Sequence, residues 1–340
     1  MRRISAHITV IHHHRVHRGP HTSLERRHRM PASFNQAIID EFRANGGKVG
    51  GPFEGGDLLL LTTTGAKSGA EHTVPLGYVR DGELLLIVGS AGGAPRHPAW
   101  YHNVLAHPQV RVEIGTETLE LIAVPAEGAW RDRLFERVVG VAPGYADYQS
   151  GTSRILPVVV LEPSGAEAAE GPAEIGNLAD KLVQVHGWLR AQLRHIRTET
   201  DAHLAARAAD GGSGEPPAPG IGLQIRQHCL AFCQFLTFHH TSEDAHSFTV
   251  LANHHPHLRE AIDRLGEEHR TLARIKDALL ALLADITAAD PERFRAELAR
   301  LSAELVAHLD YEEEELLPVL SEIPWPPGPP VPEPAGGEVS

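Results

Sequence analysis

The sequence predicts a two-domain protein of the α+β class, in which a small β-barrel precedes an up-down four-helix bundle. A chain of 340 residues is longer than one hydrophobic core usually spans. Six short runs rich in branched residues lie between residues 57 and 161, and turn formers separate them. Four long amphipathic stretches follow from residue 176 onward, which is typical of a helical bundle.

The first domain is placed at residues 31–163. Apolar residues recur at helical spacing over residues 31–44 and a pair of glycines follows, which predicts a helix that ends there. Because only short helices separate the strands, we expect the six strands to form a barrel. The predicted strands are residues 57–64, 71–79, 83–88, 110–114, 116–124 and 155–161.

A linker is expected at residues 164–175, because this Ala-, Glu- and Gly-rich segment has no apolar face. The helical domain is placed at residues 176–320. Residues 1–30 and the proline-rich residues 321–340 lack apolar periodicity, so we expect disordered tails there, with Met30 as the native start. The predicted helices are residues 176–206, 221–252, 257–286 and 291–317.

The composition disfavours several classes of protein. A net charge of −13 argues against nucleic-acid binding, which needs a basic face. No stretch offers the roughly 18 consecutive apolar residues of an integral membrane segment. The two cysteines, Cys229 and Cys233, lie one helical turn apart and are interpreted as small buried residues rather than a catalytic dithiol, which fits the cytoplasm.

Two predicted helices each carry a histidine and a glutamate four residues apart, at His239–Glu243 and at His308–Glu312. This spacing places both side chains of a pair on one helix face, so facing helices can supply two carboxylates and two imidazoles to a pair of metal ions. The other two helices each offer a histidine within an apolar stripe. The predicted metal ligands are His186, His239, Glu243, His269, His308 and Glu312.

Residues 174–320 resemble the hemerythrin-like, HHE cation-binding family, whose ligand positions match these six residues one by one. The resemblance implies two non-haem iron ions in the bundle, with manganese left open. His239 is preferred over the adjacent His240 as the ligand of its helix. The acidic residues 313–315 are interpreted as a solvated face.

The third helix departs from the oxygen-carrying members of that family. Leu265 stands one turn before His269, where those members have an additional histidine. One iron ion is therefore expected to keep an open or water-filled position. Oxygen, nitric oxide or peroxide chemistry, or iron sensing, is favoured over reversible oxygen carriage.

Two segments of the first domain suggest a cofactor site. The loop Gly65–Gly69 follows a predicted strand and offers a cationic side chain, a hydroxyl and backbone amides to a phosphate, although such a loop is more often only a tight turn. The segment at residues 90–103 combines glycines, which permit close approach of the backbone to a flat ring, with aromatic residues that can wall it.

Together with residues 75–78 and 143–148, these segments resemble the deazaflavin-dependent nitroreductase family over residues 31–163. The resemblance implies a split β-barrel that uses reduced coenzyme F420 as hydride donor, with flavin mononucleotide as the alternative. It also implies that Tyr145 and Tyr148 line the acceptor pocket, where either could donate a proton or serve only in packing. The implied cofactor-binding residues are Lys67, Ser68, Gly69, Tyr78, Ser90, Gly92, Gly93, Pro98, Ala99 and Trp100.

One departure concerns Ala66, where relatives often have a basic residue, so weaker affinity for the acidic cofactor tail is expected. The combined hypothesis is a cytoplasmic F420H2-dependent oxidoreductase, of the nitroreductase or quinone-reductase type, fused to a di-iron domain that accepts its electrons for oxygen, nitric oxide or peroxide reduction. The alternative is an independent reductase that carries an iron-sensing or oxygen-sensing module. The expected partners are a small-molecule acceptor and a second copy of the chain, bound through the barrel.

Overall fold

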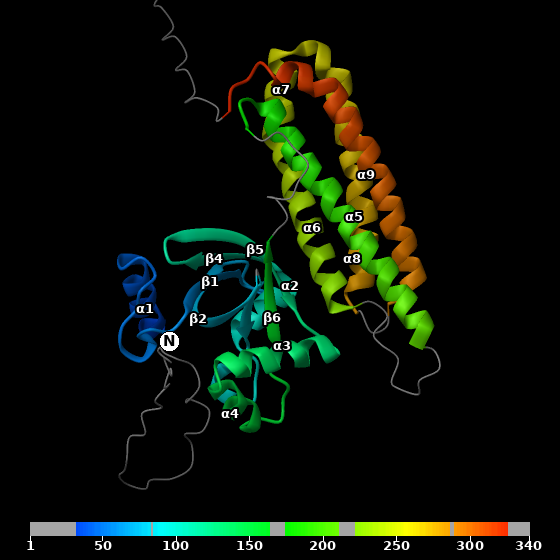
Figure 1. Ribbon diagram of the computed structural model, residues 1–340. Helices are drawn as coiled ribbons and strands as arrows, with labels where there is room; N and C mark the ends of the chain where they lie inside the picture. The colour runs from blue at the N-terminus through cyan, green and yellow to red at the C-terminus, as the bar shows by residue number, and fades with distance from the viewer. Residues whose placement is uncertain (1–31, 83, 164–173, 211–221, 286–288, 326–340) are drawn as a thin grey trace, which may run out of the picture. The chain divides into compact units, whose positions relative to one another are not determined.

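The computed structural model describes residues 32–82, 84–163, 174–210, 222–285 and 289–325 (Figure 1). Their contacts define two compact units, one within residues 1–164 and 222–231 and the other within residues 165–221 and 232–340. The predicted tail at residues 1–30, with Met30, and most of the predicted linker lie outside the described residues.

The first unit contains a closed antiparallel barrel, which confirms the predicted fold class (Figure 1). The strand order is β1-β2-β3-β6-β5-β4, and pairing of β1 with β4 closes the sheet. The strands are β1 (Leu58–Thr64), β2 (Glu71–Asp81), β3 (Leu84–Val88), β4 (Gln109–Ile114), β5 (Glu117–Pro125) and β6 (Val158–Pro163). The last strand begins three residues later than predicted, because Pro157 has no amide hydrogen to donate to the ladder.

Strand β1 begins with a continuous run of apolar residues because both of its faces are covered. Leu59 and Leu61 point into the barrel interior, whereas Leu58 and Leu60 pack on the other face against helix α1 (Ala32–Ala44). Side chains on a strand alternate between its two faces, so a strand that is covered on both faces is apolar throughout. The predicted helix at the start of the domain therefore has a packing role.

Three further helices complete the first unit. Helices α3 (Gly128–Val141) and α4 (Gly144–Ser150) pack against outward-facing residues of β3 and β6. Helix α2 (Ala99–Ala106) contributes Trp100 and Val104 to the barrel interior. Short 3₁₀ turns lie at Gly51–Phe53 and Ala91–Gly93.

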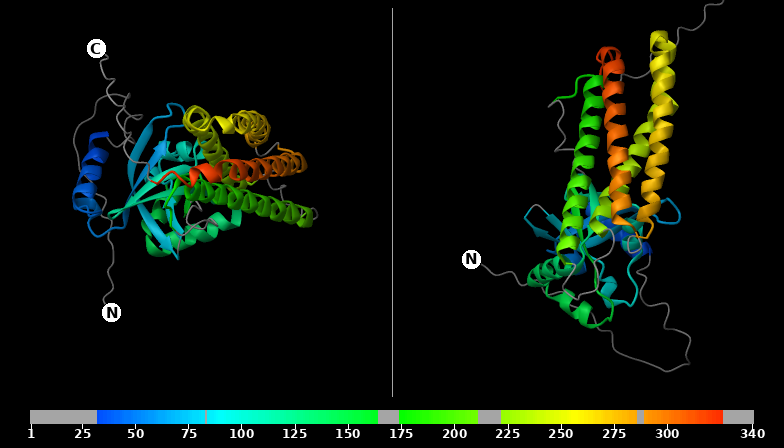
Figure 2. Two further views of the ribbon diagram at one scale, coloured as in Figure 1. Left: turned by 90° about the horizontal axis from the view of Figure 1, so that it is seen from above. Right: turned by 90° about the vertical axis from the view of Figure 1, so that its right-hand side faces the viewer.

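The second unit contains three of the predicted helical segments and the second segment from residue 232 onward, because residues 222–231 belong to the first unit. Helix α9 lies in contact with both α5 and α8 (Figure 2). The second segment is not one continuous α-helix, because a π-helical turn at Glu243–Ser247 interrupts it. The elements are α5 (Leu178–Asp210), α6 (Leu223–Ser242), α7 (Phe248–His254), α8 (Arg259–Leu283) and α9 (Pro291–Leu320), with a 3₁₀ turn at Pro256–Leu258.

The ends of the helices follow local chemistry. Asp290 caps α9, because its carboxylate accepts from the backbone N–H groups of Glu292 at 3.0 Å and Arg293 at 3.1 Å, and Pro291 occupies the first helical position. After α9, the Leu178 amide donates to the Ile323 carbonyl at 2.9 Å. Ordered chain therefore extends a few residues into the predicted tail at residues 321–340.

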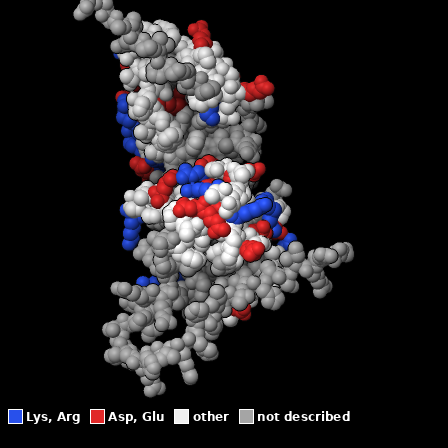
Figure 3. All heavy atoms as spheres, turned by 90° about the vertical axis from the view of Figure 1, so that its left-hand side faces the viewer, with Lys and Arg blue, Asp and Glu red and all other residues white. Residues whose placement is uncertain are grey.

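Within the described residues, no helix combines the length and the apolarity that crossing a membrane requires. Neither cysteine forms a disulfide, and both are buried, as predicted. Basic and acidic side chains are interspersed on one face of the molecule (Figure 3). The ion pairs of the first unit include Arg43–Glu113 and Arg111–Glu71.

The buried stripe of α9 supports a first prediction. Leu305 is fully buried, whereas the next residue, Val306, is 39% exposed. Leu305→Ala leaves a cavity in the bundle and lowers its free energy of unfolding by about 2–5 kcal/mol. Val306→Ala, the control, changes it by less than about 0.5 kcal/mol. Thermal unfolding followed by helical circular dichroism compares them, and equal midpoints for the two variants would contradict the described packing.

Candidate metal centre and candidate cofactor site

The structure brings the six predicted metal ligands together in the interior of the second unit. His186 comes from α5, His239 from α6, His269 from α8 and His308 from α9, and all four are buried. Glutamates join them from the π-helical turn and from α9. The first ligand group consists of His186, His239, Glu243 and Glu312, whose ligand atoms lie within 4.8 Å of one another.

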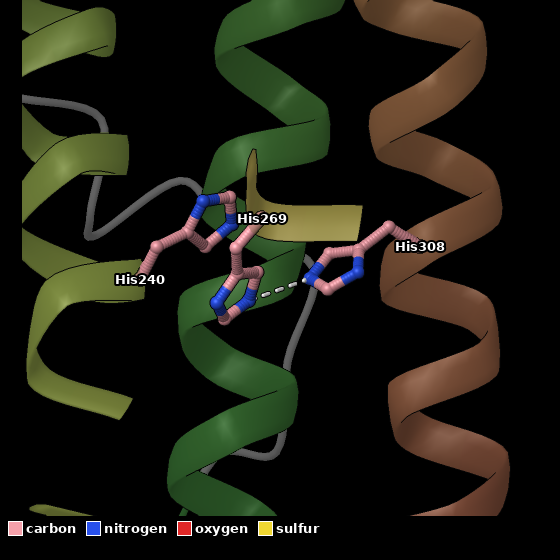
Figure 4. A group of neighbouring side chains, drawn as sticks. All are labelled: His240, His269 and His308. Atoms are coloured by element: carbon pink, nitrogen blue, oxygen red, sulfur yellow. Dashed lines mark hydrogen bonds between the residues drawn. The ribbon is translucent and has the colours of Figure 1, made fainter. Parts of the chain in front are cut away.

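A second ligand group lies beside the first and contains a histidine that the sequence interpretation left out. His240, His269 and His308 offer ligand nitrogens that also lie within 4.8 Å of one another (Figure 4). The Nε2 atoms of His269 and His308 are 3.2 Å apart. His239 and His240 thus both face the interior, one in each group.

The two glutamates connect the two groups. Glu312 Oε2 lies 3.4 Å from His186 Nε2 and 3.6 Å from His308 Nε2. Glu243 Oε1 lies 3.1 Å from His239 Nδ1, and Glu243 Oε2 lies 3.7 Å from His269 Nε2. Each carboxylate therefore contacts an imidazole of both groups, which is the placement that a bridge between two metal ions needs.

The π-helical turn brings Glu243 into this position. Glu243 and the next buried residue of the segment, Phe248, are five residues apart, one more than α-helical spacing provides. The wide turn absorbs the extra residue, so that Glu243, Phe248 and Leu251 are all buried. π-helical turns of this kind occur frequently at functional sites. The spacing of five residues between Glu243 and Phe248 was the sequence signal for the π-helical turn.

Three imidazoles are oriented by carboxylates on the outer side of the cluster. The Nδ1 atoms of His186, His269 and His308 lie 2.8, 2.8 and 3.0 Å from carboxylate oxygens. These contacts hold the rings so that Nε2 faces the centre, as in the carboxylate–histidine–metal arrangement of metalloproteins. The orienting carboxylates belong to Glu313, Asp244 and Glu268, respectively.

The interpretation of Glu313 as part of a solvated face is wrong. Its side chain is 22% exposed and contacts both His186 and the guanidinium of Arg190, which donates to it at 2.7 Å. Glu313 immediately follows the predicted ligand Glu312, and Arg190 lies one helical turn after the predicted ligand His186. That pairing of charges on two facing helices was the signal that the sequence offered.

The chemistry of the cluster fits a metal centre. Buried polar atoms normally have a hydrogen-bond partner. Among the described residues, six buried side-chain atoms have none, and five of these belong to the cluster. These are the Nε2 atoms of His186, His239 and His240 and the Oε2 atoms of Glu243 and Glu312. Coordination of cations would satisfy all five.

Burial and mutual charge shift the titration of these groups. Burial raises the pKa of Glu243, and the neighbouring Glu312 raises it further. Burial opposes ionisation of Glu312 too, but contacts with His186 and other imidazoles outweigh it and lower its pKa to about 2. Burial lowers the pKa of His239 to about 3. Divalent metal ions bound between these side chains would favour ionised carboxylates and neutral imidazoles, because these are the forms that bind metal.

Two cavities in the second unit reach the cluster. The larger, of about 460 Å³, is lined mainly by apolar residues, and His239, Glu243 and Glu312 supply polar atoms in its wall. The smaller, of about 160 Å³, borders His240 and His269. Small molecules can therefore approach both ligand groups through these cavities.

In the first unit, the loop Gly65–Gly69 is a closed turn. The Gly69 amide donates to the Gly65 carbonyl at 2.9 Å, and Gly69 has φ +66°, which glycine adopts without strain. Buried Asn103 fixes the loop, because it accepts from the Ala66 amide at 3.1 Å and donates to the Thr63 hydroxyl at 3.0 Å. The loop thereby presents exposed Lys67 and Ser68 side chains on a fixed backbone.

Arg154 organises the second cofactor segment, and the sequence interpretation missed it. Its guanidinium donates to the carbonyls of Gly89 at 2.9 Å, Ser90 at 2.6 Å and Ala94 at 2.8 Å. Burial lowers its pKa, but an arginine stays charged. No pattern in the sequence singles out this arginine, because its acceptors are backbone carbonyls.

The turn that Arg154 holds has an unusual backbone. Ala91, Gly92 and Gly93 have φ values of +47°, +61° and +77°. Positive φ is uncommon for alanine and is retained where the surroundings impose it. A Cβ atom at Gly93 would lie 3.2 Å from the Tyr148 carbonyl oxygen, so this glycine permits close packing on α4.

The remaining predicted residues fall into two environments. Tyr145 and Tyr148 share α4, with ring centroids 6.0 Å apart, and burial raises the pKa of Tyr145. The Tyr145 hydroxyl lies beside Gly77 of β2. Tyr78 packs against the barrel interior and Trp100 is buried in it, whereas Pro98 and Ala99 are at least partly exposed at the start of α2.

Comparison with known proteins assigns both halves of the chain. Residues 36–163 match the family model of F420H(2)-dependent quinone reductases. The chain belongs to this family. Residues 177–320 match the hemerythrin HHE cation binding domain, so the chain is a fusion of the two.

Individual relatives match the reductase half. An F420H(2)-dependent quinone reductase of Mycobacterium tuberculosis (strain ATCC 25618 / H37Rv) is 44% identical over 124 residues, which are 35% of this chain and 83% of the relative. The solved F420-H2 dependent reductase FDR-A is 42% identical and covers 31% of this chain and 94% of that chain, with a TM-score of 0.30. A solved domain-swapped dimer is 37% identical and covers 38% of this chain and 96% of that chain, with a TM-score of 0.31.

The orienting carboxylates of the HHE domain support a second prediction. Glu313→Ala removes the acceptor that fixes the His186 ring, so iron affinity falls about 10- to 100-fold. Glu314→Ala, which changes the adjacent exposed residue, leaves affinity unchanged. Competition with a chromophoric chelator measures both. Equal affinity of the two variants would show that Glu313 does not position a ligand.

Proposed function

We propose that this chain is an F420H2-dependent oxidoreductase of the nitroreductase or quinone-reductase type, whose HHE domain holds two iron ions that accept its electrons and reduce oxygen, nitric oxide or peroxide. One observation carries this proposal. A reductase of the F420 family is fused to a buried cluster in which two carboxylates connect two groups of imidazoles.

The proposed cofactor site uses the two fixed segments of the barrel unit. Lys67, Ser68 and Gly69 would hold the phosphate and tail of the cofactor, because a cation, a hydroxyl and unencumbered amides suit a phosphate. Gly92 and Gly93 would let the backbone approach the deazaflavin ring. Pro98, Ala99 and the backbone of Trp100 would flank the ring, because the Trp100 side chain is buried in the barrel interior. Tyr78 and Ser90 would lie beside the acceptor.

Tyr145 and Tyr148 are proposed to line the acceptor pocket. Burial raises the pKa of Tyr145, so its hydroxyl stays protonated and can donate a hydrogen bond to the acceptor. Reduced F420, when bound, supplies a hydride, and its two electrons equal the number that two ferric ions accept. A quinone or nitro compound is proposed as a further small acceptor beside these tyrosines, and the chain is proposed to form a homodimer through the barrel.

In the HHE domain, the proposed ligands are the six that the sequence predicted. Their burial excludes bulk water from the polar cluster, and the orienting carboxylates bind Nδ1 of three rings so that Nε2 faces the cluster. The larger cavity would admit the small oxidant. The absence of a disulfide between the two buried cysteines supports a reducing compartment, which we propose to be the cytoplasm.

The division of the chain into two compact units favours the alternative function, an independent reductase with an iron-sensing or oxygen-sensing module. The two functions differ in what loss of the metal does to turnover. Under the coupled function, His308→Ala abolishes oxidant-dependent consumption of F420H2. Under the alternative, His308→Ala keeps full turnover towards every acceptor.

Electron transfer to the metal centre gives a third prediction. When F420H2 is mixed with the ferric full-length protein in the absence of oxygen, the ferric absorption bleaches with about one F420H2 consumed per iron pair, because a hydride carries two electrons. Stopped-flow spectroscopy follows both chromophores. An unchanged ferric spectrum, with F420H2 intact, would reject the coupling, whereas retained quinone reduction would preserve the reductase assignment.

The phosphate loop gives a fourth prediction. Lys67→Ala removes the cation that would face the cofactor phosphate and weakens F420 binding at least about tenfold, since a charge-assisted hydrogen bond contributes roughly 1.5–3 kcal/mol. Arg133→Ala removes an exposed cation on α3 and serves as the control. Fluorescence titration with F420 compares them. Identical affinities would place the phosphate elsewhere, and tight binding of flavin mononucleotide instead would reassign the cofactor.

A further inference from the structure

Helix α8 supplies one imidazole to the second ligand group and has no second one in the preceding turn. Leu265 occupies that position, is fully buried, and packs in an apolar cluster with Phe248, Leu258 and Ile262. A metal ion held only by His269, His308 and the two carboxylates would therefore have an incomplete set of ligands. The sequence interpretation expected an open or water-filled position there.

His240 occupies the space beside this set (Figure 4). Its ring stacks on that of His269, with centroids 3.9 Å apart and planes 13° apart. Its centroid lies 5.2 Å from that of His308, at a nearly perpendicular angle of 77°. His240 is only 8% exposed, and its Nε2 atom is buried without a hydrogen-bond partner. A buried imidazole nitrogen with no partner is destabilising unless something binds it.

The distances between nitrogens fit a shared metal ion. Metal–imidazole bonds of about 2.0–2.1 Å at tetrahedral to octahedral angles put neighbouring nitrogens about 3 Å apart. The Nε2 atoms of His269 and His308 already have this separation, at 3.2 Å. The ligand nitrogen of His240 lies within 4.8 Å of both, close enough for a reoriented His240 side chain to join them on one ion.

We propose that His240 is a metal ligand that takes the place of an imidazole missing from α8 at Leu265. The inference rests on the metal centre of the proposed function and adds a fifth histidine to it. One ion is then held by three imidazoles (His240, His269 and His308) and the other by two (His186 and His239), with Glu243 and Glu312 connecting them. The open position expected next to His269 is thereby filled from the neighbouring helix α6.

Metal stoichiometry in the full-length protein tests this inference without relying on activity. His240→Leu fills the same space without a ligand atom. After loading with Fe²⁺ and gel filtration, this variant should lose one of two ions or bind it at least about tenfold more weakly. His257→Leu, at an exposed histidine of the same unit, should retain both. Elemental analysis counts the ions, and circular dichroism reports whether the helices persist.

A second variant, His240→Gly, tests the same inference if leucine at this position disturbs the packing of the bundle. His240→Gly leaves a hole that exogenous imidazole can enter, and added imidazole should restore the second ion together with the Co²⁺ ligand-field spectrum of the wild type. A His240→Leu variant with both ions, wild-type affinity and an unchanged Co²⁺ spectrum would overturn the role of His240 alone. Failure of the wild type to bind any ion would instead refute the proposed function.

Discussion

Two carboxylates buried among five imidazoles are the constraint on which the bundle depends. Glu312 is 1% exposed and Glu243 is 7% exposed, and each lies close to histidines of both ligand groups. Removing an ion from water has an effective free-energy penalty of several kcal/mol, so such a cluster persists only with well-placed partners. Metal ions are the partners that its unsatisfied atoms fit.

The surrounding structure serves to hold these groups in place. Long apolar stripes on α5, α8 and α9 pack around the cluster, and outer carboxylates fix three of the rings. In the barrel, buried or half-buried polar side chains fix the loops of the candidate cofactor site. Arg154 binds three backbone carbonyls, and Asn103 binds the Ala66 amide and the Thr63 hydroxyl, so the loops proposed to hold the cofactor have fixed conformations. In both units, polar side chains within or behind the apolar core position the candidate site.

The sequence predicted the elements well because each has a strong periodic signal. Strands β1, β3 and β6 are nearly continuous apolar runs, β4 alternates apolar and polar residues, and the bundle helices carry buried residues at helical spacing, so these elements were recognisable before their partners were known. It missed features that depend on tertiary contacts. The π-helical turn at Glu243 changes which residues face inward, and a strictly α-helical projection does not contain it. Arg154 and His240 acquire their roles from residues on other elements, which no local pattern reveals, and Glu313 could be recognised only by pairing it with Arg190 of another helix.

The central claim is that side chains from four helices converge to hold two cations. A crystal structure of the iron-loaded protein, with anomalous diffraction measured at the iron absorption edge, tests it most directly. The account predicts two anomalous peaks about 3.5–4 Å apart, one within each ligand group and both next to Glu243 and Glu312. A loaded crystal with no peak inside the bundle, or with iron bound only at surface histidines, would contradict it.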